Sequence, residues 1–505
     1  MPLKISVKKT DVEKAEVDLA VLCLFDEELP KFAKSLDASM GNEISACMKS
    51  GEFGGKEAQI TVFTPCGKMP AKKFMLYGIG KKEEFKLNIA RNASANALNY
   101  ARANYLKSVA FSTEVFANLD FSPKPLAQAI VEGALLGVYD FNKYKTEDAE
   151  DIKKREISEL IILAKDGSEE LQQGVETGEC TANAVNLARD VANESANHMT
   201  PTKLSEIAKE VAKRNKLKCK ILEKDEIEKM KMGGLLAVAQ GSIEPPTFTI
   251  LEYDSGLKEA ETVAIIGKGI TFDSGGISIK PSKDMEQMKY DKSGAAAVLG
   301  VLDAASALKL SVNIIGIIPA TENLPSGSAG KPGDIITTLS GKTVEVINTD
   351  AEGRMILADA ITYAVQKHSP KVIIDLATLT GACGVALGDY AIGALGNNTQ
   401  MMDRVRKAGE ISYERVWELP LWKEYDEMMK SDVADIKNVS NTGKAGTITG
   451  AVFLKKFVGE TPWVHLDIAS TAWAQKDAGY VRKGATAVGV RLLLQMFKEW
   501  PIKKQ

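Results

Sequence analysis

The chain has 505 residues, of which 45% are hydrophobic and 26% charged, and its formal net charge is −3. This is the composition of a soluble globular protein, and it argues against a general nucleic-acid binder, which would need a basic excess. A chain of this length exceeds one ordinary hydrophobic core, so we expect two domains.

Cysteine spacing and apolar runs bear on where the protein works. Six cysteines are scattered without the paired spacing of a zinc knuckle or a disulfide framework, which predicts reduced thiols. Residues 1–7 lack the apolar stretch of a signal peptide, and no later run approaches the ~20 apolar residues of a membrane span. We therefore expect a cytoplasmic protein with no membrane partner.

The first part of the chain alternates strand-like and helical segments. Residues 19–25 and 73–78 are short apolar runs that predict strands, and the alanine-rich stretch 89–103 predicts a helix. The pattern is that of an α/β domain.

The end of this first domain is also visible in the sequence. Residues 159–164 form its last predicted strand, and 167–192 form a polar, helix-forming connector. We therefore predict an N-terminal α/β domain over residues 1–167 and a larger C-terminal domain over residues 168–505.

The alternation of strands and helices is clearer in the second domain. Strands are predicted at residues 263–266, 312–318, 344–347 and 371–376, and helices at 293–308 and 354–366. Continuous apolar strands joined by helices predict a mostly parallel sheet covered by helices on both faces. Ligands of such sheets bind beyond the carboxyl ends of the strands. The predicted fold class is thus α/β, with two domains that each hold a mostly parallel sheet flanked by helices.

Polar side chains follow two of these strands. They comprise four carboxylates, two lysines and one arginine: Lys268, Asp273, Lys280, Asp291, Asp350, Glu352 and Arg354. Oxygen ligands in this number could hold two divalent cations, which would activate a water between them. A lysine binds a metal only as the neutral amine, so Lys268 as a ligand would need a strongly lowered pKa. Taken alone, Asp350 and Glu352 fit a helix N-terminus equally well, because carboxylates there complement the helix dipole.

These segments resemble the signature of the leucyl (cytosol) aminopeptidase family in its bacterial form. The similarity runs through residues 268–280, 290–296, 348–354, 377–382 and 465–469 and so covers the C-terminal two-thirds of the chain. Members of that family are hexameric enzymes that use two metals to remove N-terminal residues from peptides. The resemblance implies the same activity for this chain, with the C-terminal domain as the dinuclear-metal peptidase domain and the N-terminal domain serving assembly or regulation.

The resemblance also implies a role for each metal ligand. Asp273 and Glu352 would bridge the two metals, Asp350 would complete one site, and Lys268 and Asp291 would complete the other. The free α-amine of the substrate would bind one metal, and a hydroxide bridging the two would attack the scissile carbonyl. The metals would be zinc or manganese, with cobalt and magnesium as alternatives, because such a ligand set suits all four.

Two further residues are implied as catalytic. Lys280 would stabilise the developing oxyanion, and Arg354 would hold a bicarbonate that carries a proton from the water to the leaving amine. A lysine followed by proline is more commonly a solvated loop residue, and an arginine in this position could instead form a structural ion pair.

The resemblance further implies a pocket for the first side chain of the substrate. Its candidate residues are Met288, Thr378, Leu379, Gly381, Ala469 and Ala472. Small residues with a pliable methionine predict a roomy apolar pocket for leucine or methionine, while the backbone carbonyls of residues 378–379 would orient the peptide. Ordinary core packing is the alternative explanation for these residues.

Other classes of function fit the sequence less well. The three histidines are expected to be structural, and the HExxH motif of zinc peptidases is absent from the sequence. A DNA-binding role would rest only on the basic stretches 153–155 and 213–218, which solvated helix faces explain better. An inactive scaffold is disfavoured because every catalytic position carries the expected residue type. The peptide-cleaving enzyme is therefore the leading prediction, and the resemblance implies that it is a homohexamer.

Overall fold

The computed structural model describes residues 3–117, 119, 121–165 and 169–501. It divides into two compact units, Met1–Asn183 with Lys476–Arg482, and Ala184–Gln475 with Lys483–Gln505. The division falls within the long helix α6 (Glu169–Asn193). The predicted boundary at residue 167 lies outside the described residues and stays a prediction. Within the described residues, no helix combines the length and the apolar character needed to cross a membrane.

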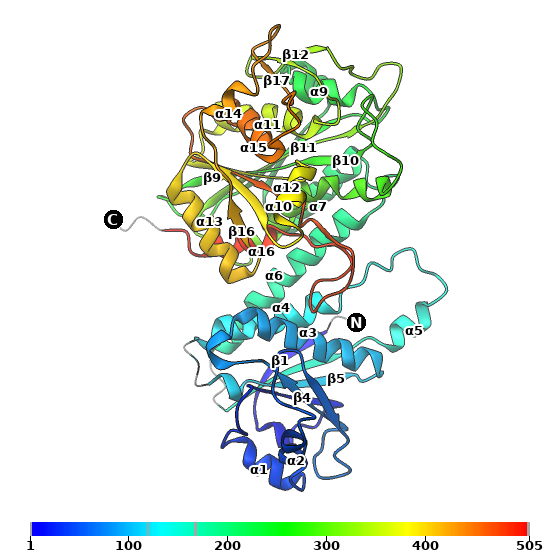
Figure 1. The fold of residues 1–505 in the computed structure, drawn as a ribbon, viewed down its shortest axis with the longest axis vertical. Helices are drawn as coiled ribbons and strands as arrows, with labels where there is room; N and C mark the ends of the chain where they lie inside the picture. The colour runs from blue at the N-terminus through cyan, green and yellow to red at the C-terminus, as the bar shows by residue number, and fades with distance from the viewer. Residues whose placement is uncertain (1–2, 118, 120, 166–168, 502–505) are drawn as a thin grey trace. The chain divides into compact units, whose positions relative to one another are not determined.

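The first unit is built on a six-stranded sheet of order β1-β6-β5-β2-β4-β3 (Figure 1). Its strands are β1 (Lys4–Lys9), β2 (Leu19–Leu24), β3 (Ile60–Phe63), β4 (Lys73–Gly78), β5 (Ser108–Ser112) and β6 (Glu159–Ala164). All pairs are parallel except β3 with β4. The strands predicted at residues 19–25, 73–78 and 159–164 are confirmed.

Helices cover both faces of this sheet. They are α1 (Ala33–Ser39), α2 (Glu43–Ser50), α3 (Leu87–Ala103) and α4 (Pro123–Gly137), whereas α5 (Ala149–Lys154) buries no residue. Alternate residues of β2 point to opposite faces, so Leu19 and Val21 join the core that includes α3 and α4, whereas Ala20 and Leu22 join the core that includes α1 and α2. The helix predicted at residues 89–103 is confirmed by α3.

The second unit holds a nine-stranded mixed sheet. Its main path runs β16-β15-β18-β14-β9-β11-β8-β7, and β10 pairs with β11. The strands are β7 (Lys218–Leu222), β8 (Thr247–Tyr253), β9 (Thr262–Gly267), β10 (Gly269–Asp273), β11 (Asn313–Asn323), β14 (Val372–Ala377), β15 (Ile392–Gly396), β16 (Val416–Glu418) and β18 (Trp463–Asp467). The central strands β18, β14, β9 and β11 are parallel, so their carboxyl ends share one edge. Both sheets confirm the predicted α/β class.

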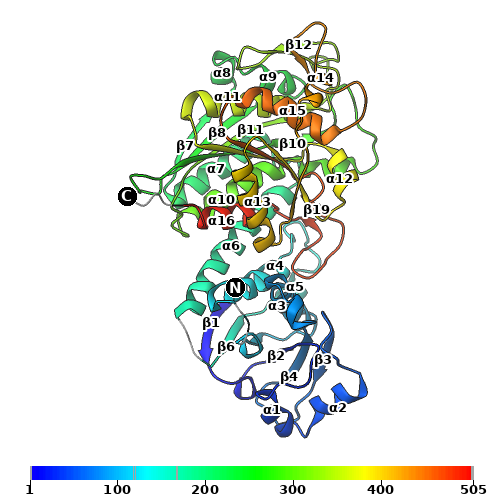
Figure 2. The ribbon, with the colours of Figure 1, turned by 60° about the vertical axis from the view of Figure 1, so that its left-hand side comes forward.

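The central strands of this sheet are covered on both faces. Figures 1 and 2 show α9 (Gly233–Ala239), α11 (Glu352–His368) and α15 (Gly446–Val458) on one side and α7 (Pro201–Asn215), α10 (Ser293–Ala305) and α16 (Val490–Lys498) on the other. Buried apolar residues on both sides of each strand explain why the central strands read as continuous hydrophobic runs.

One predicted strand belongs elsewhere. The apolar segment at residues 344–347 was expected to continue the main sheet, but β13 (Thr343–Glu345) pairs with β12 (Ile335–Thr337) and β17 (Ile436–Lys437) in a separate three-stranded sheet. That expectation is wrong, because a short apolar run has the same periodicity in any sheet. The helix that follows begins at Glu352 and not at Arg354.

Candidate metal centre

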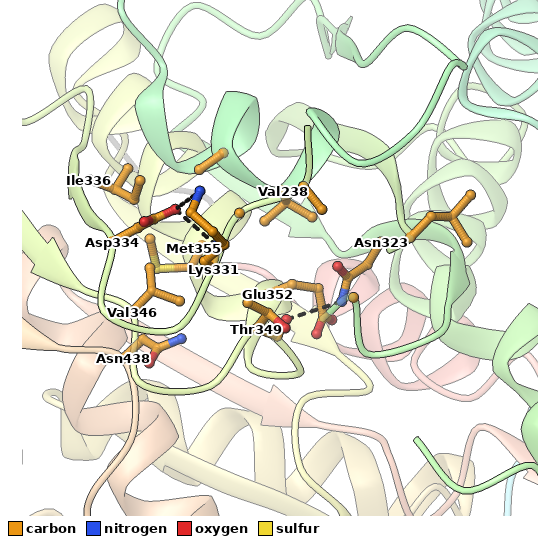
Figure 3. A pocket seen from close by; sticks show the side chains of 15 residues that line it. Val238, Asn323, Lys331, Asp334, Ile336, Val346, Thr349, Glu352, Met355 and Asn438 are labelled. Atoms are coloured by element: carbon orange, nitrogen blue, oxygen red, sulfur yellow. Dashed lines mark hydrogen bonds and ion pairs between the residues drawn. The ribbon is translucent and has the colours of Figure 1, made fainter. Parts of the chain in front are cut away.

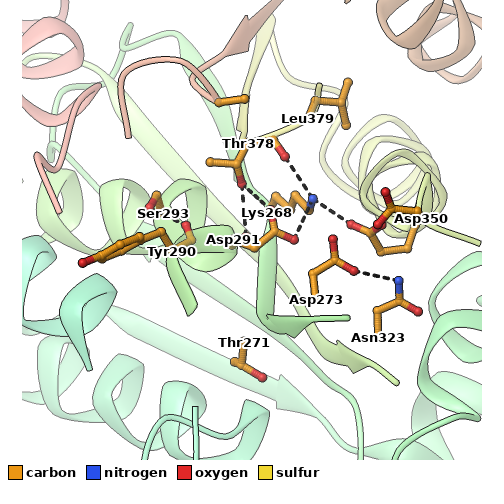
Figure 4. A network of polar contacts seen from close by, with 12 residues as sticks. Lys268, Thr271, Asp273, Tyr290, Asp291, Ser293, Asn323, Asp350, Thr378 and Leu379 are labelled. Atoms are coloured by element: carbon orange, nitrogen blue, oxygen red, sulfur yellow. Dashed lines mark hydrogen bonds and ion pairs between the residues drawn. The ribbon is translucent and has the colours of Figure 1, made fainter. Parts of the chain in front are cut away.

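The carboxyl ends of the central strands carry the first half of the site. Lys268 lies between β9 and β10, and its buried amine is 2.8 Å from Asp291 Oδ2 and 2.7 Å from Glu352 Oε1. The same amine donates a hydrogen bond to the Thr378 carbonyl at 3.0 Å. Figure 4 shows this amine among side chains from distant parts of the chain, with Asp273 facing the same space. The fold therefore brings the separate sequence motifs together.

A turn between β13 and α11 supplies the second half. Asn438 fixes this turn, because its Oδ1 accepts a hydrogen bond from the Ile347 N–H at 2.8 Å and its Nδ2 donates to the Asn348 carbonyl at 2.7 Å. Asn348 Oδ1 in turn accepts the Asp350 N–H at 2.8 Å. Glu352 then begins α11. These bonds set the direction in which both acidic side chains leave the backbone.

Three carboxylates form a compact cluster. Asp273, Asp350 and Glu352 each offer an oxygen, and these atoms lie within 4.8 Å of one another. Lys280 lies against the cluster, with its amine 2.8 Å from Asp273 Oδ2 and in contact with Asp350. The Asn323 amide donates to Asp273 Oδ1 at 2.8 Å. We call Lys268, Asp273, Lys280, Asp291, Asp350 and Glu352 the acidic cluster.

Burial and mutual repulsion perturb the carboxyl groups of the cluster. Desolvation, followed by the charge of Asp273, raises the pKa of Glu352 to about 7 and that of Asp350 to about 6. Desolvation also raises the pKa of Asp291. Burial opposes the charge of Lys268, but Asp291, Glu352 and Asp273 outweigh it and raise the pKa of the amine. Additional positive charge beside these carboxyl groups would stabilise their ionised form and lower their pKa values.

The donor set fits divalent cations. Asp291 Oδ2, Asp350 Oδ1 and both oxygens of Glu352 are buried and accept no hydrogen bond from the described residues. Lysine amines approach three of these atoms as ion pairs, whereas no described group lies at pairing distance from Glu352 Oε2. Buried acceptors without donors are costly unless a cation compensates them. Carboxylate oxygens are ligands that Mg²⁺ and Mn²⁺ favour.

Arg354 lies in the first turn of α11 and is also buried. Its Nη1 donates to the Asn438 carbonyl at 2.7 Å, whereas its buried Nε has no hydrogen-bond partner among the described residues. Burial lowers the pKa of this guanidinium to about 10. A pocket of about 310 Å³ is lined by Arg354, Asp350, Leu379 and Gly381, together with other residues. The volume suits a small organic ligand.

The remaining residues of the predicted substrate pocket lie in three places. Met288 is part of a 3₁₀ helix, η4 (Met285–Lys292), and is partly exposed. Thr378 follows β14, and its hydroxyl donates to Asp291 Oδ1 at 2.7 Å. Ala469 is partly exposed just beyond β18, and Ala472 is fully buried. The Thr378 hydrogen bond thus ties the predicted pocket to the acidic cluster.

A second pocket is narrow, with a cavity volume of about 30 Å³, and includes Glu352 in its lining (Figure 3). Glu352, Asn323 and Thr349 contribute its polar lining, and Val238 and Met355 contribute to its apolar lining. The Asn323 amide also donates to the Thr349 carbonyl at 3.1 Å. Glu352 thus lines this second pocket, whereas its neighbours Asp350 and Arg354 line the first.

Sequence reasoning missed several residues of the site. Asn323, Asn438 and Asp467 hold the loops that carry the acidic and pocket residues, yet each acts on partners about 50 to 90 positions away. His465, expected to be structural, is buried with its Nδ1 2.6 Å from Asp375 Oδ1. The sequence offered one indication of their role, which is that Asn323 and Asp467 each stand at the end of an apolar strand.

Comparison with known proteins identifies the family. The sequence model of the catalytic domain of the cytosol aminopeptidase family matches residues 186–494, and that of its N-terminal domain matches residues 20–148. The chain belongs to the cytosol aminopeptidase family. The predicted resemblance is thereby confirmed, and with it the prediction of an aminopeptidase, a metal-dependent exopeptidase that acts on peptides.

Curated relatives of the family align over nearly the whole chain. A "Probable cytosol aminopeptidase" of Roseiflexus castenholzii is 45% identical over 500 residues, covering 99% of both chains. A protein with the same description from Geobacter sp. strain M21 is 44% identical over 96% of this chain and 98% of its own.

Solved structures of similar proteins share the fold. A mutant of tomato leucine aminopeptidase is 33% identical, with a TM-score of 0.88 over 98% of this chain and 96% of its own. The bottromycin maturation enzyme BotP in complex with Mn is 29% identical, with a TM-score of 0.84 over 95% and 99% of the two chains. Metal dependence in this chain agrees with its acidic cluster and with the manganese in that relative.

Proposed function

We propose that the chain releases N-terminal amino acids, preferably those like leucine and methionine, from peptides, with two divalent metal ions bound at the acidic cluster. The observation that carries the proposal is the meeting of Asp273, Asp350 and Glu352 within 4.8 Å, with Lys268 and Asp291 beside them. The manganese complex of BotP favours manganese, and zinc, cobalt or magnesium would suit the same oxygens.

Five residues of the acidic cluster would hold the two ions. They are Asp273, Asp350 and Glu352, with Lys268 and Asp291 beside them. Lys268 would have to lose its proton to bind. Its contacts with Asp291 and Glu352 stabilise the protonated amine, so the charge of the bound ions would have to replace that of the ammonium group. When bound, the two ions would lower the pKa of a water between them and polarise the scissile carbonyl.

The residues of the chain itself then orient the reaction. The Lys280 amine, held by Asp273 and Asp350, would donate a hydrogen bond to the oxyanion that develops on the carbonyl. Arg354, with its free Nε and its place in the pocket wall, would hold a bicarbonate that relays a proton to the leaving amine.

The first side chain of the substrate would lie against apolar walls. These are formed by Met288, Thr378, Leu379, Gly381, Ala469 and Ala472. The Thr378 and Leu379 carbonyls would orient the substrate amine, and small residues leave room for a branched side chain. The requirement for a free N-terminus follows from the proposed binding of the α-amine to one ion.

We further propose a homohexamer in the cytoplasm, with the N-terminal α/β domain over residues 1–167 serving assembly or regulation and residues 168–505 forming the peptidase domain. Names of the curated relatives support the location. Sedimentation of the full chain would measure the oligomeric state, and a stable monomer would contradict the proposal.

The proposal is tested by measuring metal content and hydrolysis together. Elemental analysis should find two metal ions per chain, and leucine anilide hydrolysis should vanish on chelation and return with Mn²⁺ or Zn²⁺. Methionine and leucine anilides should be cleaved faster than the glycine anilide. Activity that survives complete metal removal would contradict the proposed mechanism. A metal-bound chain that cleaves none of these anilides would contradict the proposed substrate class.

A further inference from the structure

Asp467 is the last residue of β18, and its carboxylate is fully buried. It lies outside the acidic cluster. Its Oδ1 accepts three backbone N–H groups, from Leu379 at 3.2 Å, Thr380 at 3.4 Å and Ala469 at 3.1 Å. Its Oδ2 accepts the Thr380 hydroxyl at 2.6 Å. One side chain therefore holds two separate backbone segments.

These two segments are the walls of the proposed substrate pocket. Leu379 belongs to the loop after β14, and Ala469 to the segment after β18. The two strands are neighbours, with Ala377 opposite Asp467. Because the segments are about 90 positions apart in sequence, their spacing depends on the contacts that join them across the sheet edge.

The loop after β14 is also fixed at its other end. The Thr378 hydroxyl donates to Asp291 Oδ1 at 2.7 Å, and the Thr378 carbonyl accepts the Lys268 amine at 3.0 Å. The acidic cluster thus sets one end of this loop, and Asp467 sets the other. A shift at the Asp467 end would move Leu379 and Ala469 relative to the cluster.

We infer that Asp467 is a positioning residue that determines side-chain selectivity, by fixing the distance between the two pocket walls. The inference rests on the proposed function. Asp467 touches no reacting atom in this scheme, because its oxygens are occupied by the N–H and O–H groups of the walls. It acts through the positions of Leu379 and Ala469.

Asp467→Asn is the principal variant, because asparagine has nearly the same shape but offers one acceptor oxygen in place of two. We expect metal content to stay at the wild-type level, and the kcat/KM ratio of leucine anilide to alanine anilide to fall about tenfold, mainly through KM. If the two pocket walls move apart, the larger leucine side chain loses more contacts than the alanine side chain does.

Asp359→Asn is the matched control. Asp359 is equally buried and accepts the Leu235 and Leu339 N–H groups at 2.9 and 2.7 Å, but it holds no wall of the proposed substrate pocket. We expect this variant to lose stability and to keep the wild-type selectivity. Equal selectivity in the two variants would overturn the inference, because Asp467 would then be an ordinary structural carboxylate.

Thr380 provides a second pair of variants if Asp467→Asn does not fold. Thr380→Ser keeps the hydroxyl that donates to Asp467 and should retain the wild-type selectivity, whereas Thr380→Val removes it and should lower the selectivity. Loss of selectivity in both, or in neither, would contradict a role that depends on this hydrogen bond.

Hydrogen exchange separates this inference from the proposed function. In Asp467→Asn, the amides of Leu379, Thr380 and Ala469 should exchange faster than in the wild type, and those of Leu235 and Leu339 should not change. Unchanged protection of the first three amides would overturn the positioning role even in a fully active enzyme. A wild-type chain that cleaves no anilide would instead overturn the proposed function and, with it, the selectivity claim.

Discussion

The second unit contains two kinds of buried carboxylate at the same sheet edge. In the acidic cluster, Glu352 Oε2 has no donor among the described residues, and the Lys268 amine approaches Glu352 Oε1 and Asp291 Oδ2 only as an ion pair. At Asp467, both oxygens accept N–H or O–H donors. A buried acceptor without a donor costs free energy, whereas a satisfied one stabilises the loops it joins. The contrast separates carboxylates arranged for a ligand from those arranged for the fold.

Burial alone does not make this distinction. Desolvation is the largest influence on both groups, and it raises the pKa of Glu352 to about 7 and also raises that of Asp467. The partners differ. Asp273 and Asp291 raise the pKa of Glu352 further, against the lowering effect of Lys268 and Lys280. The neighbours of Asp467, which are His465, the Thr380 hydroxyl and backbone N–H groups, all lower its pKa. Neighbouring groups therefore tell more about function than exposure does.

The largest expected effect is the loss of activity in Glu352→Ala. We expect hydrolysis at the background rate together with a fall in metal content, because the variant removes a proposed metal ligand. Asp359→Asn, which removes a buried charge outside the cluster, should keep its metal. A Glu352→Ala enzyme with both ions and full turnover would remove the distinction between the two kinds of carboxylate.

Asp375→Ala should lower the stability of the fold and leave metal binding unchanged. Asp375 accepts hydrogen bonds from Trp463 Nε1 at 2.6 Å and lies 2.6 Å from His465 Nδ1, and all three residues are fully buried. Breaking a buried charged pair costs about 3–5 kcal/mol. Urea unfolding should show that loss, while the folded fraction keeps the wild-type metal content. A drop in metal content without a drop in stability would contradict the comparison.

Arg354→Ala should slow turnover by about 100-fold, the scale of a lost proton relay. Metal content should not change, because Arg354 is not among the proposed ligands. Added bicarbonate should stimulate the wild type and have no effect on the variant. If bicarbonate stimulates both equally, Arg354 is not its binding site.

The smallest expected effect is a pH dependence of stability from His465. Burial opposes its charge, but Asp375 outweighs burial and raises the pKa of His465 above its ordinary value of 6.5. A raised folded-state pKa means that the stabilisation is complete below about pH 6.5 and is lost as the pH rises through the folded-state value. The difference in unfolding free energy between the wild type and His465→Gln should shrink across that range. A difference that grows with pH would show that His465 is buried in the neutral form.

Local patterns in the sequence determined much of the fold. Strands β2, β4, β6, β9 and β14 fall where the apolar runs predict them, because a buried parallel strand requires a continuous apolar run. The motif at residues 348–354 likewise indicated a cluster of acidic side chains, since its residue types are unusual so close together. These features depend on neighbours in sequence.

Tertiary structure alone decided the rest. The placement of β13 in a separate sheet depends on pairing with β17, which lies about 90 residues further along the chain. The support of the metal-binding turn by Asn438 and of the pocket walls by Asp467 likewise joins residues more than 80 positions apart. A single asparagine or aspartate at a strand or loop end has no periodicity that marks its partner. The sequence therefore determined which groups could bind a metal, and the packing of the sheet edge determined which groups hold them in place.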